Sequence, residues 1–112
     1  MDIWYAFNIV NNSNQTIDVC AAYVFPDTLL PVNKPDLIEI KPIKIGNLHG
    51  YHFNDDTFER FKKERLTIFI LDKKDVDTYS WEYLREHDMV LKRYVGSAND
   101  FPFNNGLTIH YP

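Results

Sequence analysis

Two histidines and a following carboxylate form the best candidate for a metal site in the sequence. His49 and His52 lie three positions apart, and Asp55 and Asp56 follow them closely. Imidazole nitrogens and carboxylate oxygens are ligands that zinc accepts in a tetrahedral arrangement. Gly50 argues against a helix that would align the histidines, so a polar loop with two solvent-facing histidines is the alternative. A small metal-dependent hydrolase using His49, His52 and Asp55 is therefore one hypothesis.

No residue pattern suited to nucleophilic catalysis is visible. Cys20 lies within an alternating apolar segment, where a small buried packing residue is expected. The serines lack the flanking glycines of a nucleophile elbow, and the four glycines form no phosphate-binding loop. The residues favour a protein without catalytic activity or a bound cofactor.

Aromatic side chains are the remaining chemical signal. They make up 15% of the chain. Several lie beside turns or off the apolar stripe of a helix, and rings exposed there can stack on sugars or fill a pocket of a partner protein. We identify Tyr79, Trp81 and Tyr83 as candidate ligand-binding residues. The alternative is that a small domain uses large rings to bury enough apolar area.

The charge balance narrows the classes of partner. The chain has 16 acidic and 12 basic residues, and its formal net charge is −4. A mildly acidic chain without a basic run lacks the electrostatic footprint of a nucleic-acid-binding protein. No segment approaches the roughly 20 apolar residues of a membrane span. A protein or a glycan at the cell surface remains a possible partner.

Apolar alternation and apolar runs predict six strands, at residues 3–10, 16–23, 37–45, 66–71, 89–95 and 107–111. The first two are separated only by a polar segment rich in Asn, which predicts a β-hairpin. The alternation of the third strand slips at Pro42, so we expect a bulge or an edge position there. The fourth is the most apolar and is typical of a central strand.

Capping residues predict two short helices. One covers residues 54–64, and the other covers residues 80–87 after a cap at Thr78 or Ser80. Residues 72–77 are expected to form a charged turn. One more helical turn after Ser97 would be a third helix.

Strands therefore dominate, and they do not alternate with long helices. This order favours a single mainly β domain over residues 1–112, a compact antiparallel β-sandwich of Ig-like or Greek-key type with two or three short helices. The alternative is an α+β fold with helices packed on one antiparallel sheet.

Several short motifs occur in a fixed order along the chain. They are FPDTLLP at 25–31, the pattern T-h-F-I-x-D (h, hydrophobic) at 67–72, Y-S-W-x-x-L-R at 79–85, V-L-x-R-Y at 90–94 and I-x-Y-P at 109–112. This order resembles a family of small uncharacterised exported proteins of gut bacteria, many of them lipoproteins. The resemblance implies no catalytic residue.

The resemblance does imply a location. We expect the chain to act in the periplasm or on the outer-membrane surface, and the 112 residues to be a mature domain without its export signal. A cytoplasmic domain that assembles through an edge strand is the alternative, since residues 1–7 show no signal peptide. The stretch around Thr28 is similar to O-glycosylation sites of exported proteins in such bacteria, with a Pro-Asp turn as the alternative reading.

The motif residues also have a structural interpretation. Ser80 is expected to cap a helix, Trp81 to anchor it, and Arg93 to be a partly buried cation paired with Asp72 or Glu82. We therefore expect a non-enzymatic accessory or interaction module. A carbohydrate-binding module acting through exposed aromatic rings is the alternative.

Overall fold

The computed structural model describes residues 8–47, 60, 63–97 and 108–112. Seven strands and two helices lie in this part of the chain: β1 (Asn8–Asn11), β2 (Ile17–Ala22), β3 (Ile38–Ile40), β4 (Lys44–Asn47), β5 (Leu66–Asp72), α2 (Lys73–Thr78), α3 (Trp81–Glu86), β6 (Lys92–Gly96) and β7 (Thr108–Tyr111). The predicted mainly β class is confirmed. Most of the predicted helix at 54–64 and the helical turn after Ser97 lie outside the described residues.

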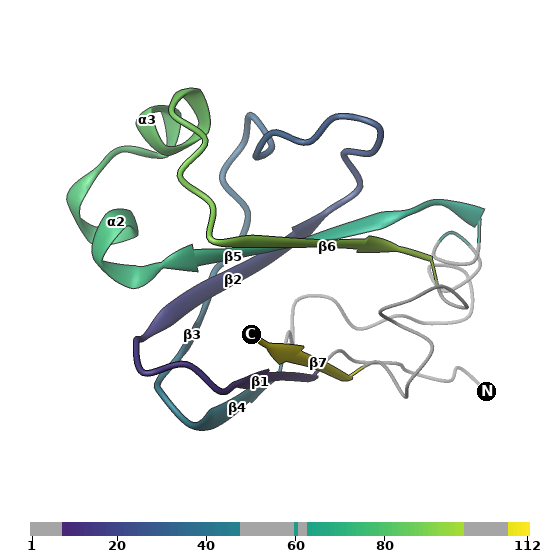
Figure 1. The fold of residues 1–112 in the computed structure, drawn as a ribbon. Helices are drawn as coiled ribbons and strands as arrows, with labels where there is room; N and C mark the ends of the chain where they lie inside the picture. The colour runs from purple at the N-terminus through teal and green to yellow at the C-terminus, as the bar shows by residue number, and fades with distance from the viewer. Residues whose placement is uncertain (1–7, 48–59, 61–62, 98–107) are drawn as a thin grey trace.

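The strands form two sheets. The order is β4-β1-β7 in a three-stranded sheet and β3-β2-β5-β6 in a four-stranded sheet. All pairs are antiparallel except β1 and β7, which run parallel. In Figure 1 the three-stranded sheet lies below the four-stranded sheet, and both helices and the loop at residues 23–37 lie above it. The described elements thus form three layers.

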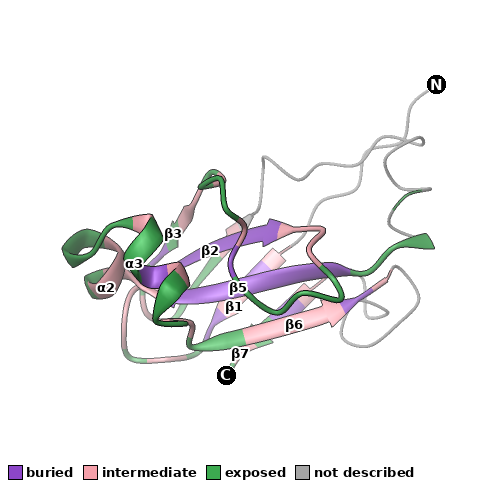
Figure 2. Cartoon of the chain, turned by 90° about the horizontal axis from the view of Figure 1, so that it is seen from above, coloured by how far each residue is buried: buried purple, intermediate pink, exposed green. Residues whose placement is uncertain are grey.

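The four-stranded sheet is buried on both faces, so it carries the core. Towards the three-stranded sheet, Ile17, Val19, Ile68 and Ile70 pack in a cluster that includes Ile9 and Ile109. On the other face, Cys20, Phe69 and Leu71 pack against Leu30 of the loop and Leu84 of α3. Figure 2 shows β5 buried along its length, as expected for its continuous apolar sequence.

The predicted hairpin between the first two strands is wrong. β1 pairs with β4 and β7, whereas β2 pairs with β3 and β5 in the other sheet. β1 and β2 together follow one bent path, and β3 and β4 follow another that runs antiparallel to it. The resulting ribbon bends from one sheet into the other. Strands that change sheets at a bend are a known way of making such corners.

The buried amide of Asn11 holds this corner. Its Nδ2 donates to the carbonyl oxygens of Gln15 at 2.9 Å, Ile40 at 3.0 Å and Lys41 at 3.2 Å. Its Oδ1 accepts from the Ser13 N–H at 3.0 Å and the Ser13 hydroxyl at 2.6 Å. The side chain is fully buried and therefore needs these partners. One residue thus ties both bends of the ribbon together.

The second bend explains the slip in alternation at Pro42. Residues 41–43 connect β3 to β4 in a tight turn where Ile43 has φ = 59°, an unusual value for a β-branched residue. The Ile43 N–H donates to the Asn11 carbonyl at 2.9 Å. β4 lies close to β3 after this turn, because a Cβ added at Gly46 of β4 would lie 2.5 Å from the Ile40 side chain of β3. The slip therefore marks a change of sheet.

Both helices begin at a capping side chain. Asp72 accepts from the Lys74 N–H at the start of α2, and Ser80 accepts from the Tyr83 N–H at the start of α3. The helix predicted at 80–87 is therefore confirmed with its Ser80 cap. The charged turn predicted at 72–77 is wrong, because Asp72 ends β5 and residues 73–77 belong to α2, where Lys73 and Asp77 are in contact at 3.0 Å between successive turns.

We predict that Asn11→Ala destabilises the domain by about 2–4 kcal/mol, because three carbonyl groups and Ser13 lose their buried partner. Urea denaturation followed by circular dichroism measures the change. Asn12→Ala is the matched control, since this neighbouring side chain is exposed. Equal stability of the two variants would contradict the assigned role of the Asn11 amide.

Candidate functional site

The residues proposed for a metal site lie outside the described part of the chain. This holds for His49, His52 and Asp55. Within residues 8–47, 60, 63–97 and 108–112, no three His, Cys, Asp or Glu side chains are grouped so that they could hold a metal ion. The metal-dependent hydrolase therefore stays a hypothesis from the sequence.

Two of the three aromatic candidates stack with a histidine along α3. The rings of Tyr79 and Tyr83 lie 4.5 Å apart at 9°, and those of Tyr83 and His87 lie 3.9 Å apart at 18°. Tyr83 and His87 are four residues apart at the end of α3, whereas Tyr79 precedes the helix as the C-cap of α2 and reaches Tyr83 from there. Tyr79 is 39% exposed and Tyr83 is 38% exposed. We call these three residues the aromatic column.

The stacking limits what the aromatic column can bind. Both faces of the Tyr83 ring are covered by its neighbours, so the ring presents its edge and hydroxyl group to solvent. His87 is further held by a contact of 3.0 Å between Nδ1 and the Tyr83 carbonyl. A sugar that stacks needs an open ring face, which only the two ends of the column offer. The exposed ring edges and hydroxyl groups are better suited to contacts with a protein surface than to stacking on a sugar.

The third candidate, Trp81, has a different position. Its indole Nε1 donates to the Pro31 carbonyl at 2.8 Å, and its ring is half-buried against the Leu30 and Leu84 cluster. Trp81 therefore connects α3 to the loop at residues 23–37 and lies apart from the aromatic column.

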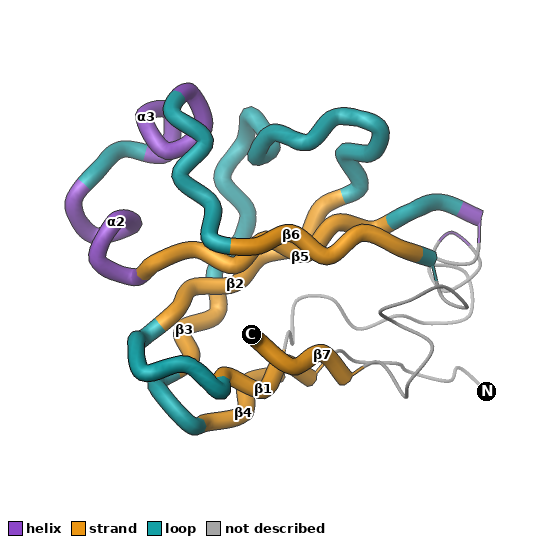
Figure 3. The backbone as a smooth tube through the Cα atoms, viewed as in Figure 1, coloured by secondary structure: helices purple, strands orange, loops and turns teal. Residues whose placement is uncertain are grey.

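Two arginines hold the same loop. The Arg85 Nε donates to the Leu30 carbonyl at 2.8 Å, and the Arg93 Nε donates to the Thr28 carbonyl at 2.6 Å. With Trp81, three side chains from α3 and β6 thus bind three carbonyl groups between residues 28 and 31. We call this arrangement the loop clamp. Figure 3 shows the loop alongside α3 above the sheets.

The loop clamp explains the order of the motifs. Trp81 and Arg85 belong to the Y-S-W-x-x-L-R motif, Arg93 to the V-L-x-R-Y motif, and the carbonyl groups to the FPDTLLP segment. The acidic partner expected for Arg93 was wrong, because its guanidinium pairs with Asp88. Asp88 follows α3 directly and has φ = 51°. The sequence pattern did not distinguish Asp88 from the other acidic residues as the partner of Arg93.

The clamped loop displays apolar side chains. Leu30 points into the core, whereas Leu29 and Val32 are exposed, Val32 by 73%. The Asp27 carboxylate accepts from the Leu29 N–H at 2.9 Å, so the Pro-Asp turn is formed. Thr28 is exposed in this turn. Its modification stays a prediction.

The buried groups of β2 have perturbed acid–base properties. Burial, with a smaller contribution from Asp18, raises the pKa of the Cys20 thiol to about 12, so Cys20 is a protonated packing residue at neutral pH. Burial also raises the pKa of Asp18, and the ammonium group of Lys73, 3.9 Å away, only partly offsets this effect. Asp18 is thus a buried carboxyl whose ion pair with Lys73 is long.

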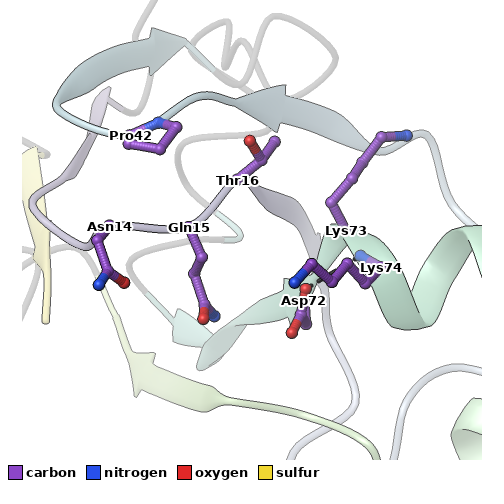
Figure 4. A pocket seen from close by; sticks show the side chains of 7 residues that line it. All are labelled: Asn14, Gln15, Thr16, Pro42, Asp72, Lys73 and Lys74. Atoms are coloured by element: carbon purple, nitrogen blue, oxygen red, sulfur yellow. Dashed lines mark hydrogen bonds between the residues drawn. The ribbon is translucent and has the colours of Figure 1, made fainter.

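A pocket lies where the bent ribbon meets the start of α2. It encloses about 350 Å³ and is lined by Asn14, Gln15, Thr16, Pro42, Asp72, Lys73 and Lys74. Figure 4 shows Gln15, Asp72 and Lys74 extending to one side of the pocket while Lys73 turns away. The Lys73 N–H donates to the Thr16 carbonyl at 3.2 Å and joins the two walls. We call it the corner pocket; the sequence offered no signal for it.

These features define a small mainly β domain with an outer layer of helices and loop. No family model, curated protein or solved structure matches the chain. Among the described residues, no helix is long and apolar enough to cross a membrane. The function is therefore inferred from the side chains themselves.

We predict that Arg85→Met destabilises the domain by about 1–2 kcal/mol, because the buried Leu30 carbonyl loses its donor while the apolar stem is kept. Hydrogen exchange measured by mass spectrometry should show faster exchange at residues 27–32. Lys63→Met, a change at an exposed lysine, is the control. Unchanged exchange in the loop would count against the loop clamp.

We predict that Asp18→Asn stabilises the domain at pH 7. The pKa of Asp18 is raised above 3.8 in the folded state, so its ionised form disfavours folding. In the wild type, the stability that the neutral carboxyl contributes is present below pH 3.8 and lost as the pH rises through the raised value. The advantage of Asp18→Asn should therefore shrink towards acidic pH in denaturation at several pH values.

The control for this pH series is Asp36→Asn, which changes an exposed carboxylate. Its effect on the free energy of unfolding should stay within about 0.5 kcal/mol. An Asp18→Asn variant less stable than the wild type at pH 7 would show that Lys73 outweighs the cost of burial.

Proposed function

We propose that this protein is a non-enzymatic interaction module that binds a protein partner through its layer of helices and loop. The single observation that carries the proposal is the loop clamp. Three side-chain donors fix one short loop segment and leave Leu29 and Val32 exposed at its surface. A rigid scaffold that presents a loop in one conformation is typical of recognition surfaces, since little conformational freedom is lost on binding.

The aromatic column extends this surface along α3. Of the eight large exposed apolar side chains among the described residues, six lie in the same layer and at its rim, namely Phe25, Leu29, Val32, Tyr79, Tyr83 and Leu91. The other two, Ile43 and Ile45, lie at the second bend and on β4. Tyrosine rings of this kind contribute strongly to protein–protein interfaces, because they bury a large area and keep a polar edge. The Cys20 thiol is buried and protonated, so it does not serve as a nucleophile.

The charge of the helical region indicates the chemistry of the partner. Between residues 72 and 88 there are six acidic and three basic residues, namely Asp72, Asp75, Asp77, Glu82, Glu86 and Asp88 against Lys73, Lys74 and Arg85. Among the described ion pairs, none involves Glu82 or Glu86, which are exposed on α3. A partner with a basic, partly apolar surface complements this region.

As part of the same proposal, we locate this module in the periplasm or on the outer-membrane surface, a location that the resemblance to exported proteins of gut bacteria supports. The glycan-binding alternative is less well supported at the aromatic column, because the faces of the Tyr83 ring are covered. A glycan would have to use the outer face of Tyr79 or His87.

Site-specific photo-crosslinking in the source organism tests the proposal. A photoreactive amino acid at Glu86, beside the aromatic column, should give a protein adduct. The same amino acid at His110, exposed on the strand β7 of the other sheet, is the control and should not give it. The adduct formed from position 86 should be lost when Tyr83→Ser is added, because the aromatic column is interrupted.

The identified protein should then bind the purified domain in calorimetry, with an affinity that falls as salt is added. Tyr83→Ser should weaken this affinity by about tenfold or more if the ring is central to the interface. The proposal is wrong if positions 86 and 110 give the same adducts, or if the purified pair does not bind.

A further inference from the structure

The corner pocket brings together polar side chains that have no other task in the fold. Among the described residues, no hydrogen bond or ion pair involves the side chains of Asn14, Gln15, Thr16 or Lys74. Asp72 uses one carboxylate oxygen, Oδ1, to cap α2, which leaves Oδ2 unused. Lys73 differs, because its ammonium group lies 3.0 Å from Asp77. The pocket therefore combines free donors and free acceptors from two segments, residues 14–16 and residues 72–74.

The backbone around the corner pocket is well fixed. Gln15 lies next to the Asn11 amide, which binds the Gln15 carbonyl, and Thr16 is held through its carbonyl by the Lys73 N–H. Asp72 is anchored as the cap of α2. The polar groups thus project from backbone whose position is set by the corner of the ribbon.

The mixture of charges selects the class of ligand. The Asp72 carboxylate disfavours a simple anion, and the Lys74 ammonium group disfavours a simple cation. A neutral polyol carries neither cost, because each hydroxyl group can donate to a carboxylate or amide oxygen and accept from an ammonium or amide N–H. The ring of Pro42 adds an apolar wall on which C–H groups can pack.

The size of the pocket limits the ligand further. About 350 Å³ lies near the lower end of the range of roughly 300–1,000 Å³ for small-molecule sites. We infer that the corner pocket is a binding site for one neutral monosaccharide unit, free or at the end of a glycan, recognised by Gln15, Asp72 and Lys74. This site is distinct from the loop clamp and the aromatic column, although Asp72 and Lys74 also belong to the charged helical region. A few exposed hydrogen bonds predict a dissociation constant of order 1–10 mM.

Titration of the ¹⁵N-labelled protein followed by NMR tests this inference. The probes are glucose, galactose, mannose and N-acetylglucosamine, with serine and sulfate as zwitterionic and anionic comparisons, each to about 50 mM. At least one neutral sugar should shift the amide signals of Thr16, Lys73 and Lys74 in a saturable way. Failure of all four sugars, or shifts with serine or sulfate alone, would overturn the inference.

Two variants test the assigned residues. Lys74→Met and Gln15→Ala should each weaken sugar binding by about threefold or more, since each removes a hydrogen-bonding partner. Lys44→Met removes an exposed lysine on β4, outside the pocket, and should leave the affinity unchanged. Spectra of the variants without sugar verify that each one is folded. Equal affinities of Lys74→Met, Gln15→Ala and Lys44→Met would also overturn the inference.

Discussion

The hydrogen bonds of the Asn11 amide are the constraint on which the rest of the described structure depends. They join the two bends of the β1–β2 and β3–β4 ribbon, so the chain leaves one sheet and enters the other at the same corner. Once the ribbon is bent, the apolar faces of the two sheets meet around Ile9 and Ile109. A buried amide has no access to water, so only this arrangement satisfies its donors and acceptor. The corner therefore specifies the sandwich as well as stabilising it.

The arrangement also decides where binding can occur. The four-stranded sheet is covered on both faces, so its central strands cannot form a recognition surface. The exposed features lie in the outer layer of helices and loop, where the loop clamp and the aromatic column are found, and at the corner itself. In each case rigid backbone presents side chains that the core does not need. This division between a packed sheet and polar or aromatic margins is the physical basis of both proposals.

The sequence predicted the local features of this fold well. The apolar run at 66–71 predicted a central strand, and Ser80 predicted the start of a helix, because both depend on neighbouring residues. The hairpin and the charged turn at 72–77 were predicted wrongly. The hairpin prediction failed because two strands joined by a short polar segment have the same sequence pattern whether they pair with each other or enter different sheets. The turn prediction failed because α2 is stabilised by its Asp72 cap and by its position at the end of β5.

For the candidate site, too, the sequence predicted individual residues but not their arrangement. Tyr79 and Tyr83 were identified from the sequence as candidate ligand-binding residues, but their stacking with His87 and the separate role of Trp81 follow from the geometry of α3. The amino-acid sequence by itself determined the mainly β class, the acidic charge and the motif residues. Only the tertiary structure decided that the motifs meet in the loop clamp and that Gln15 and Lys74 line the same pocket. Periodicity reports which residues share a face, whereas contacts between distant segments depend on how the chain bends between sheets.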